Sequence, residues 1–123
     1  MGNARLRAIH FLDLMASGVF DRYPELQIIL GHWGEILPYY AIRLDENLST
    51  AITGLERIPS DYLRNNAYLT PSGIFSQRHL QFCLDVVGPD RIMFSVDYPY
   101  IPIDGLPRPG RRVRQRPTRH RPR

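Results

Sequence analysis

Two stretches decide the fold of this chain: Ile28-Ile29-Leu30-Gly31-His32-Trp33-Gly34-Glu35 and Ile92-Met93-Phe94-Ser95-Val96-Asp97-Tyr98-Pro99. Each begins as an apolar run rich in branched side chains and ends in a group able to do chemistry. Buried parallel strands read as near-continuous hydrophobic runs, and in α/β barrels the working residues follow the carboxyl ends of the strands. An imidazole after one such strand and a carboxylate after another therefore predict part of a metal-assisted active site.

Helical and strand patterns alternate around these two stretches. The spacing predicts helices over residues 5–20, 36–50, 60–63 and 77–87, and strands over residues 26–30, 67–70 and 91–95. Such alternation is typical of a parallel sheet with helical crossovers, and so of a section of a barrel or of a doubly wound sheet. The chain has no Gly-x-Gly-x-x-Gly motif and no phosphate-binding loop, which argues against nucleotide-binding folds.

Length and charge divide the chain into two parts. With 123 residues it can form one domain, whereas a complete eight-stranded barrel needs about 250 residues. All 16 basic residues are arginine, and eight of them lie in residues 108–123, so residues 1–107 carry eight arginines against 12 acidic residues. We expect residues 1–106 to form the domain and residues 107–123 to be a disordered tail, which would bind nucleic acid only non-specifically through its charge.

The sequence predicts a cytoplasmic protein without a membrane partner. No apolar run approaches the roughly 20 residues of a membrane span, and the first residues lack a signal-peptide pattern. The single Cys83 cannot form an internal disulfide. Because Cys83 stands between apolar neighbours, we expect it to be a small buried hydrophobic residue.

His32 and Glu35 form the first candidate catalytic group. A neutral imidazole held by a carboxylate is a good general acid or base near neutral pH. The same pattern fits a buried histidine whose hydrogen bonds only stabilise the fold, and Glu35 alone fits an acidic residue at a helix start. Spacing leaves these interpretations open.

Asp97 is the candidate metal ligand. A carboxylate this close to a buried strand needs a partner, which could be a metal ion, an arginine or the backbone amides of the turn. A zinc or manganese site normally needs three or four protein ligands. The residues thus predict an incomplete site, with Asp97 as one ligand and His32 as the proton-transfer group. Thr70 and Ser72 fit either a pocket wall or turn chemistry, and the aromatic residues Trp33, Tyr39 and Tyr40 fit either a pocket or the core.

Over residues 5–105 the sequence resembles the amidohydrolase-related family (the amidohydrolase 2 type). The most similar group is that of the aminocarboxymuconate-semialdehyde, resorcylate and dihydroxybenzoate decarboxylases, and the resemblance is to their C-terminal part. Three motifs carry it in order: residues 17–24 (SGVFDRYP), residues 28–38 (IILGHWGEILP) and residues 90–99 (DRIMFSVDYP).

The resemblance implies an α/β fold, a metal-dependent TIM (β/α)8 barrel, with a divalent metal, zinc or manganese. In this family His32 is the catalytic acid or base after strand six, Glu35 orients it, and Asp97 after strand eight binds the metal and can take part in proton transfer. In decarboxylating members the metal holds the carboxylate of a small carboxylic-acid substrate while a carbon is protonated and carbon dioxide leaves. In hydrolytic relatives the metal activates water. The family also implies a homodimer.

The departures from the family pattern are equally specific. The Glu-x-His or His-x-His motif after the first strand is missing, and so is the metal-binding histidine after the fifth. We therefore expect a partial barrel, about strands six to eight with their helices, which exposes two open sheet edges and is inactive by itself. The alternatives are a metal-dependent hydrolase of the same superfamily, or a truncated non-catalytic product with a polyanion-binding tail. The change to arginine and proline after Gly105 suggests a shifted reading frame.

Overall fold

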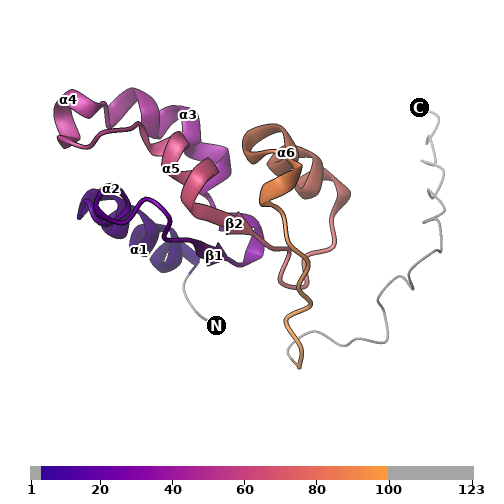
Figure 1. Ribbon diagram of the computed structural model, residues 1–123. Coiled ribbons are helices and arrows are strands. Elements are labelled where there is room, and N and C mark those ends of the chain that lie inside the picture. Colours follow the sequence, from indigo (N-terminus) through magenta and orange to yellow (C-terminus); the bar gives the residue numbers. More distant parts are fainter. Residues whose placement is uncertain (1–3, 100–123) are drawn as a thin grey trace, which may run out of the picture.

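The computed structural model describes residues 4–99, which form helices around a short parallel sheet (Figure 1). The helices are α1 (Ala4–Ala16), α2 (Val19–Arg22), α3 (Leu37–Asn47), α4 (Thr50–Thr53), α5 (Pro59–Asn66) and α6 (Gln77–Val87), with 3-10 turns η1 (His32–Gly34) and η2 (Pro89–Arg91), and the strands are β1 (Ile28–Leu30) and β2 (Ala67–Leu69). The tail predicted for residues 107–123, and with it the domain boundary, lies outside the described residues.

The two strands pair in parallel, as predicted for helical crossovers. Ile28 lies opposite Ala67, and Leu30 lies opposite Leu69. Backbone hydrogen bonds continue this pairing past the strand ends, from Thr70 N–H to the Leu30 carbonyl (2.9 Å) and from Trp33 N–H to the Thr70 carbonyl (2.8 Å). The turns that follow β1 and β2 are therefore held side by side.

The strand predicted for residues 91–95 is wrong in extent, because only one bridge forms there. Ile92 pairs in parallel with Leu69, and Met93 N–H donates to the Leu69 carbonyl at 2.9 Å. Directly beyond this point the chain is exposed, with Phe94 at 73%. An apolar run is typical of a strand that is covered on both faces, whereas in this segment Met93 and Phe94 remain exposed.

The helices follow the predicted pattern with changed boundaries. The helix expected over 5–20 is broken after Ala16, because Gly18 adopts a left-handed conformation (φ 79°) before α2 begins. The helix expected over 36–50 ends at Asn47 and is followed by α4, and the short helix expected over 60–63 extends as α5. Helix α6 has the predicted bounds.

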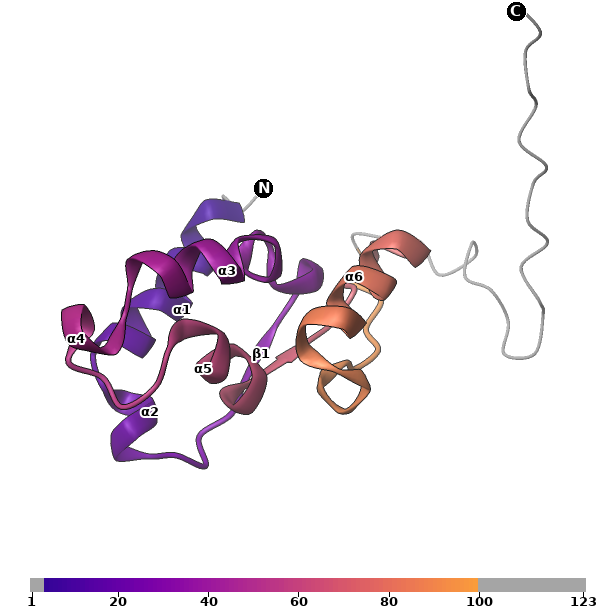
Figure 2. The ribbon, with the colours of Figure 1, turned by 90° about the horizontal axis from the view of Figure 1, so that it is seen from above.

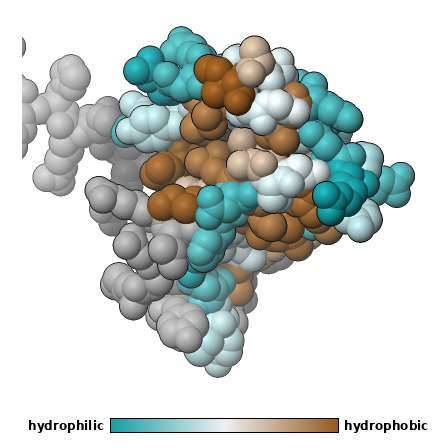
Figure 3. Space-filling view, turned by 90° about the vertical axis from the view of Figure 1, so that its left-hand side faces the viewer, coloured by the Kyte–Doolittle hydropathy of each residue, from teal (hydrophilic) through white to brown (hydrophobic). Residues whose placement is uncertain are grey.

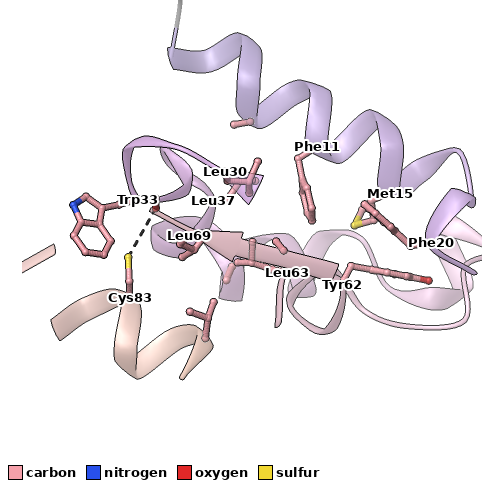
Figure 4. Close-up of a cluster of buried hydrophobic side chains, with 14 residues drawn as sticks. Phe11, Met15, Phe20, Leu30, Trp33, Leu37, Tyr62, Leu63, Leu69 and Cys83 are labelled. Atoms are coloured by element: carbon pink, nitrogen blue, oxygen red, sulfur yellow. Dashed lines mark hydrogen bonds between the residues drawn. The ribbon is translucent and has the colours of Figure 1, made fainter. Parts of the chain in front are cut away.

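The core forms where the helices close on the sheet. Helix α3 packs against both α5 and α6, whereas α1 and α6 lie at opposite ends of the molecule in both ribbon views (Figures 1 and 2). Leu69, fully buried on β2, lies in the middle of the cluster (Figure 4). Phe11 and Phe20 pack on one side of it with ring centroids 5.5 Å apart. Burial of each such side chain stabilises the fold by about 1.5–3 kcal/mol.

Part of the apolar surface remains uncovered. Figure 3 shows apolar side chains gathered in the middle of one face, between polar ones. Ile29 on β1 is 60% exposed, and Tyr39 and Ile42 on α3 are 74% and 76% exposed. In the part of the chain that the structure describes, no helix combines the length and the apolar character needed to cross a membrane.

Candidate active site at the carboxyl ends of the strands

Unusual backbone geometry marks the turns that follow the strands. Within residues 4–99, five residues other than glycine have positive φ: His32, Trp33 and Glu35 after β1, Ser72 after β2, and Asp97 after the Ile92 bridge. Residues with a Cβ rarely adopt positive φ, and those that do cluster at active sites and ligand clamps. The unusual conformations therefore gather at one end of the sheet.

The structure brings the three predicted site residues together. His32 Nε2 lies 3.6 Å from Asp97 Oδ2, and His32 Nδ1 lies 3.3 Å from Glu35 Oε1. The side chain of Glu35 is 13% exposed, that of His32 27% and that of Asp97 36%. The imidazole thus has one carboxylate on each side and stays open to a small molecule.

Arg7 joins this group although the sequence does not point to it. Its NH1 lies 2.8 Å from His32 Nδ1 and 3.6 Å from Glu35 Oε1. Arg7 precedes His32 by 25 residues and belongs to α1. No motif signals this contact, because it depends on how α1 packs beside the end of β1.

A cluster of hydroxyl groups joins the turns to one another. Thr70 Oγ1 lies 3.2 Å from Ser72 Oγ, and Ser72 N–H donates to Ser95 Oγ at 3.0 Å. Of the two interpretations left open for Thr70 and Ser72, these contacts fit turn chemistry. The Ser95 hydroxyl continues the attachment of the third segment to β2 beyond the Ile92 bridge.

Two hollows flank Glu35. One of about 210 Å³ lies between α1 and β1, and Arg7, His10 and Glu35 are among its lining residues. A second of about 370 Å³ lies between α3 and α6, with Tyr39 and Phe82 in its wall.

Trp33 and Cys83 line the second hollow from the core side. Trp33 is 5% exposed and Cys83 is 2% exposed, so both belong to the core. The prediction that Cys83 is a small buried hydrophobic residue is confirmed. Burial raises the pKa of the Cys83 thiol to about 11, which keeps it protonated and unreactive near neutral pH.

The donor set fits part of a divalent metal site. Asp97 supplies a carboxylate and His32 an imidazole, which are donors that manganese and zinc accept. Residues 4–99 contain no cluster of three or more histidine, cysteine, aspartate or glutamate residues able to hold a metal ion. Because such ions normally take three or four protein ligands, His32 and Asp97 would make up only a portion of a set.

Comparison with known proteins identifies the family. A family model described as amidohydrolase matches residues 1–118. A gamma-resorcylate decarboxylase of Polaromonas is 45% identical over 102 residues, which cover 79% of this chain and 31% of the relative. The chain thus spans less than a third of the length of the curated relatives it matches.

Solved structures give the same result. The crystal structure of a 2,6-dihydroxybenzoate decarboxylase from Rhizobium is 42% identical, with a TM-score of 0.74 over 82% of this chain and 32% of that one. A dihydroxybenzoic acid decarboxylase from Polaromonas, solved with manganese and the inhibitor 2-nitroresorcinol, is 46% identical, with a TM-score of 0.73 over 79% of this chain and 30% of that one.

The chain belongs to the amidohydrolase family matched by this model. The predicted resemblance to resorcylate-type decarboxylases is confirmed, and the α/β class with it. The assignment of the strands to positions six to eight of a barrel stays a prediction.

Proposed function

We propose that this chain is the C-terminal part of a metal-dependent decarboxylase that removes the carboxylate of a small aromatic acid as carbon dioxide. The observation that carries the proposal is the facing pair of His32 Nε2 and Asp97 Oδ2, 3.6 Å apart, on the turns that follow the two parallel segments flanking β2. The relatives that this chain resembles are named as decarboxylases of resorcylate and dihydroxybenzoate, which supports this substrate class.

His32 is the proton-transfer group in this proposal. The doubly protonated imidazolium form of His32 passes a proton to the ring carbon that bears the carboxylate and becomes a neutral imidazole, and the bond from that carbon to the carboxylate then breaks. Carbon dioxide leaves, and the electron pair of the broken bond restores the aromatic ring. The imidazole regains its proton from solvent, which reaches it because His32 is 27% exposed. Glu35 lies beside His32 Nδ1, on the edge of the imidazole ring that faces away from Asp97.

Asp97 is the proposed ligand of a divalent metal, whose other ligands come from a segment that this chain does not supply. The manganese bound in the Polaromonas decarboxylase supports that metal, and zinc remains the alternative. When bound, the ion would supply a Lewis acid to the substrate. Asp97 would hold the ion while its Oδ2 faces His32 Nε2 at 3.6 Å.

A chimera tests the proposal without requiring this chain to act alone. Residues 4–99 replace the matching segment of the Polaromonas gamma-resorcylate decarboxylase, which is 45% identical. We expect the manganese-loaded chimera to release carbon dioxide from 2,6-dihydroxybenzoate. His32→Asn should lower kcat by about 10²-fold or more, the usual contribution of a general acid, and Asp97→Asn should lower both manganese content and kcat.

Asp85→Asn is the matched control, because Asp85 is an exposed carboxylate on α6 that accepts a hydrogen bond from Gln81. It should leave kcat unchanged. A chimera that folds and binds manganese but does not decarboxylate the substrate would contradict the proposal. Full activity in His32→Asn would do the same.

A further inference from the structure

We propose that the outer side of α3 is the surface through which two copies of this chain associate about a two-fold axis. This α3 surface consists of large apolar and aromatic side chains that are between 41% and 76% exposed: Ile36, Tyr39, Tyr40, Ile42 and, on α6, Phe82. The homodimer that the family resemblance implies leaves open which surface the two copies share. The association does not depend on the proposed catalytic activity.

The side chains of the α3 surface form one continuous patch. The ring centroid of Tyr39 lies 5.3 Å from that of Tyr40 and 6.1 Å from that of Phe82 on α6. Ile42 follows Tyr39 by three residues, which places it on the same side of the helix. Contiguous exposed apolar patches mark interaction sites, and the cores of protein interfaces are enriched in aromatic residues.

The inner side of α3 is already packed within the chain. Leu37 and Ala41 are buried, and the space that they leave between α1, α3 and α5 is only about 10 Å³. In Figure 1, α3 lies at the top of the molecule and both strands lie below it. Within residues 4–99, the outer side is therefore the side of α3 that a partner can cover.

The segments that the longer relatives have and this chain does not match would lie elsewhere. In α/β barrels the helices form the outer ring, so further strands and helices extend the two layers sideways from the edges of the sheet. Ile29 on β1 and Phe94 beyond the Ile92 bridge are exposed at these edges. The α3 surface belongs to the helical layer, whose outside such a fold leaves to solvent or to another chain.

The shape and charge of the α3 surface suit a second copy of itself. In a two-fold interface the same patch lies on both partners, and here the projecting side chains of Tyr39 and Ile42 lie beside the hollow of about 370 Å³ between α3 and α6. Arg43 NH1 lies 3.2 Å from Glu46 Oε2, and both side chains are exposed. Two copies thus meet without an excess of either charge, and Arg43 of one can pair with Glu46 of the other.

The apolar area is sufficient for a stable dimer. An aromatic side chain buries about 150–250 Å² when it is fully covered, so the three aromatic and two isoleucine side chains of the α3 surface offer several hundred Å² per copy. Each partner in a standard interface buries about 800 Å², of which a little over half is apolar. The α3 surface supplies an area of this size.

Cysteine cross-linking of the full chain tests which surfaces meet. Ile42 is the middle residue of α3, so two copies of it lie closest to the proposed axis, and oxidised Ile42→Cys should form disulfide-linked dimers. Ile52→Cys is the matched control, because Ile52 on α4 is 69% exposed against 76% for Ile42. Cys83 adds little background, since it is 2% exposed and burial raises the pKa of its thiol to about 11.

A second measurement compares two exposed tyrosines. Tyr39→Ser should raise the dissociation constant of the dimer about tenfold or more, the usual effect of removing an aromatic side chain from the centre of an interface. Tyr23→Ser, at an exposed tyrosine that follows α2, should leave it unchanged. Light scattering over a range of concentrations gives both constants, and the fluorescence of Trp33 shows whether each variant is folded.

Four results would overturn the α3 surface as the contact. They are a wild-type chain that is monomeric at every concentration, equal cross-linking of Ile42→Cys and Ile52→Cys, cross-linking of Phe94→Cys without that of Ile42→Cys, and an unchanged dissociation constant in Tyr39→Ser. If Ile42→Cys does not fold, Glu46→Cys takes its place one turn further along α3. The readouts need neither metal nor turnover, so the dimer contact and the proposed decarboxylation can fail separately.

Discussion

Gly31 determines how closely the turns after β1 and β2 approach each other. A Cβ added at this position would lie 2.6 Å from Ser72 Oγ, which is closer than real Cβ contacts. Its φ of −74° is open to any residue, so the requirement for glycine is steric. Ser72 in turn contacts Thr70 and Ser95, and through them Gly31 affects the spacing of the whole site.

We predict that Gly31→Ala destabilises the chain by about 1–3 kcal/mol, the usual cost of overpacking. Ser72→Ala removes the hydroxyl that causes the clash, because the Ser72 Cβ would lie an ordinary 3.6 Å away. In urea denaturation, the double variant should therefore be more stable than the sum of the two single effects. Strict additivity in this cycle would show that the two residues do not meet.

The site residues differ in how far the sequence can reveal them. His32, Glu35 and Asp97 follow apolar runs, and the carboxyl ends of parallel strands meet at one edge of a sheet, so their convergence can be predicted. Arg7 cannot be found in this way. Its place follows from the packing of α1, which no local pattern encodes.

At the scale of elements, a buried tyrosine connects α2 to α5. The Tyr62 hydroxyl donates to Asp21 and accepts from the Arg57 N–H at 3.2 Å, and the Arg57 guanidinium lies 4.3 Å from the ring centroid. Burial and the hydrogen bond to Asp21 raise the pKa of Tyr62, so the hydroxyl keeps its proton and remains a donor. The loop between α4 and α5 is thus fixed to the end of α2.

Tyr62→Phe should lower the free energy of unfolding by about 1–3 kcal/mol, because it removes the hydrogen-bond partner of Asp21 Oδ1 and of the Arg57 N–H, both half-buried. The fluorescence of Trp33, the single tryptophan, reports unfolding from within the core. Tyr68→Phe on β2 is the matched control, since it keeps the ring under Arg91 and should change stability little. Equal losses in the two variants would count against this role of Tyr62.

The sequence predicts the ends of a helix correctly where local residues mark them. Helix α6 has its expected bounds because Gly88 and Pro89 end it. The break at Gly18 is not visible in the apolar spacing, which continues across it. The third strand fails for a different reason, since the run from Ile92 to Val96 bridges β2 at Ile92 alone and leaves Met93 and Phe94 exposed.

At the scale of the whole molecule, the exposed apolar surface is what we expect of a chain that spans less than a third of the length of its relatives. Soluble monomers rarely expose large contiguous apolar patches. The outward side chains of β1, α3 and the Ile92 segment, among them Ile29, Ile42 and Phe94, are all more than half exposed. We infer that these surfaces are covered when the protein works.

The purified chain should therefore self-associate, as the expected homodimer or as larger species, in size-exclusion chromatography with light scattering. Ile42→Lys removes one of the most exposed apolar side chains of α3 and should reduce the association. Asn47→Lys adds the same charge to an exposed position of the same helix and serves as the control. A compact monomer that unfolds cooperatively would contradict the expectation.

The bridge at Ile92 leaves Asp97 less firmly held than His32. His32 follows a strand whose backbone pairing continues through Thr70 and Trp33. The segment that carries Asp97 is attached through the hydrogen bond from Met93 N–H to the Leu69 carbonyl and the hydrogen bond between Ser72 and Ser95. Loss of these two bonds would free the Asp97 carboxylate while leaving β1 and β2 paired. The separation of His32 and Asp97 therefore depends on the attachment of one short segment rather than on the pairing of the sheet.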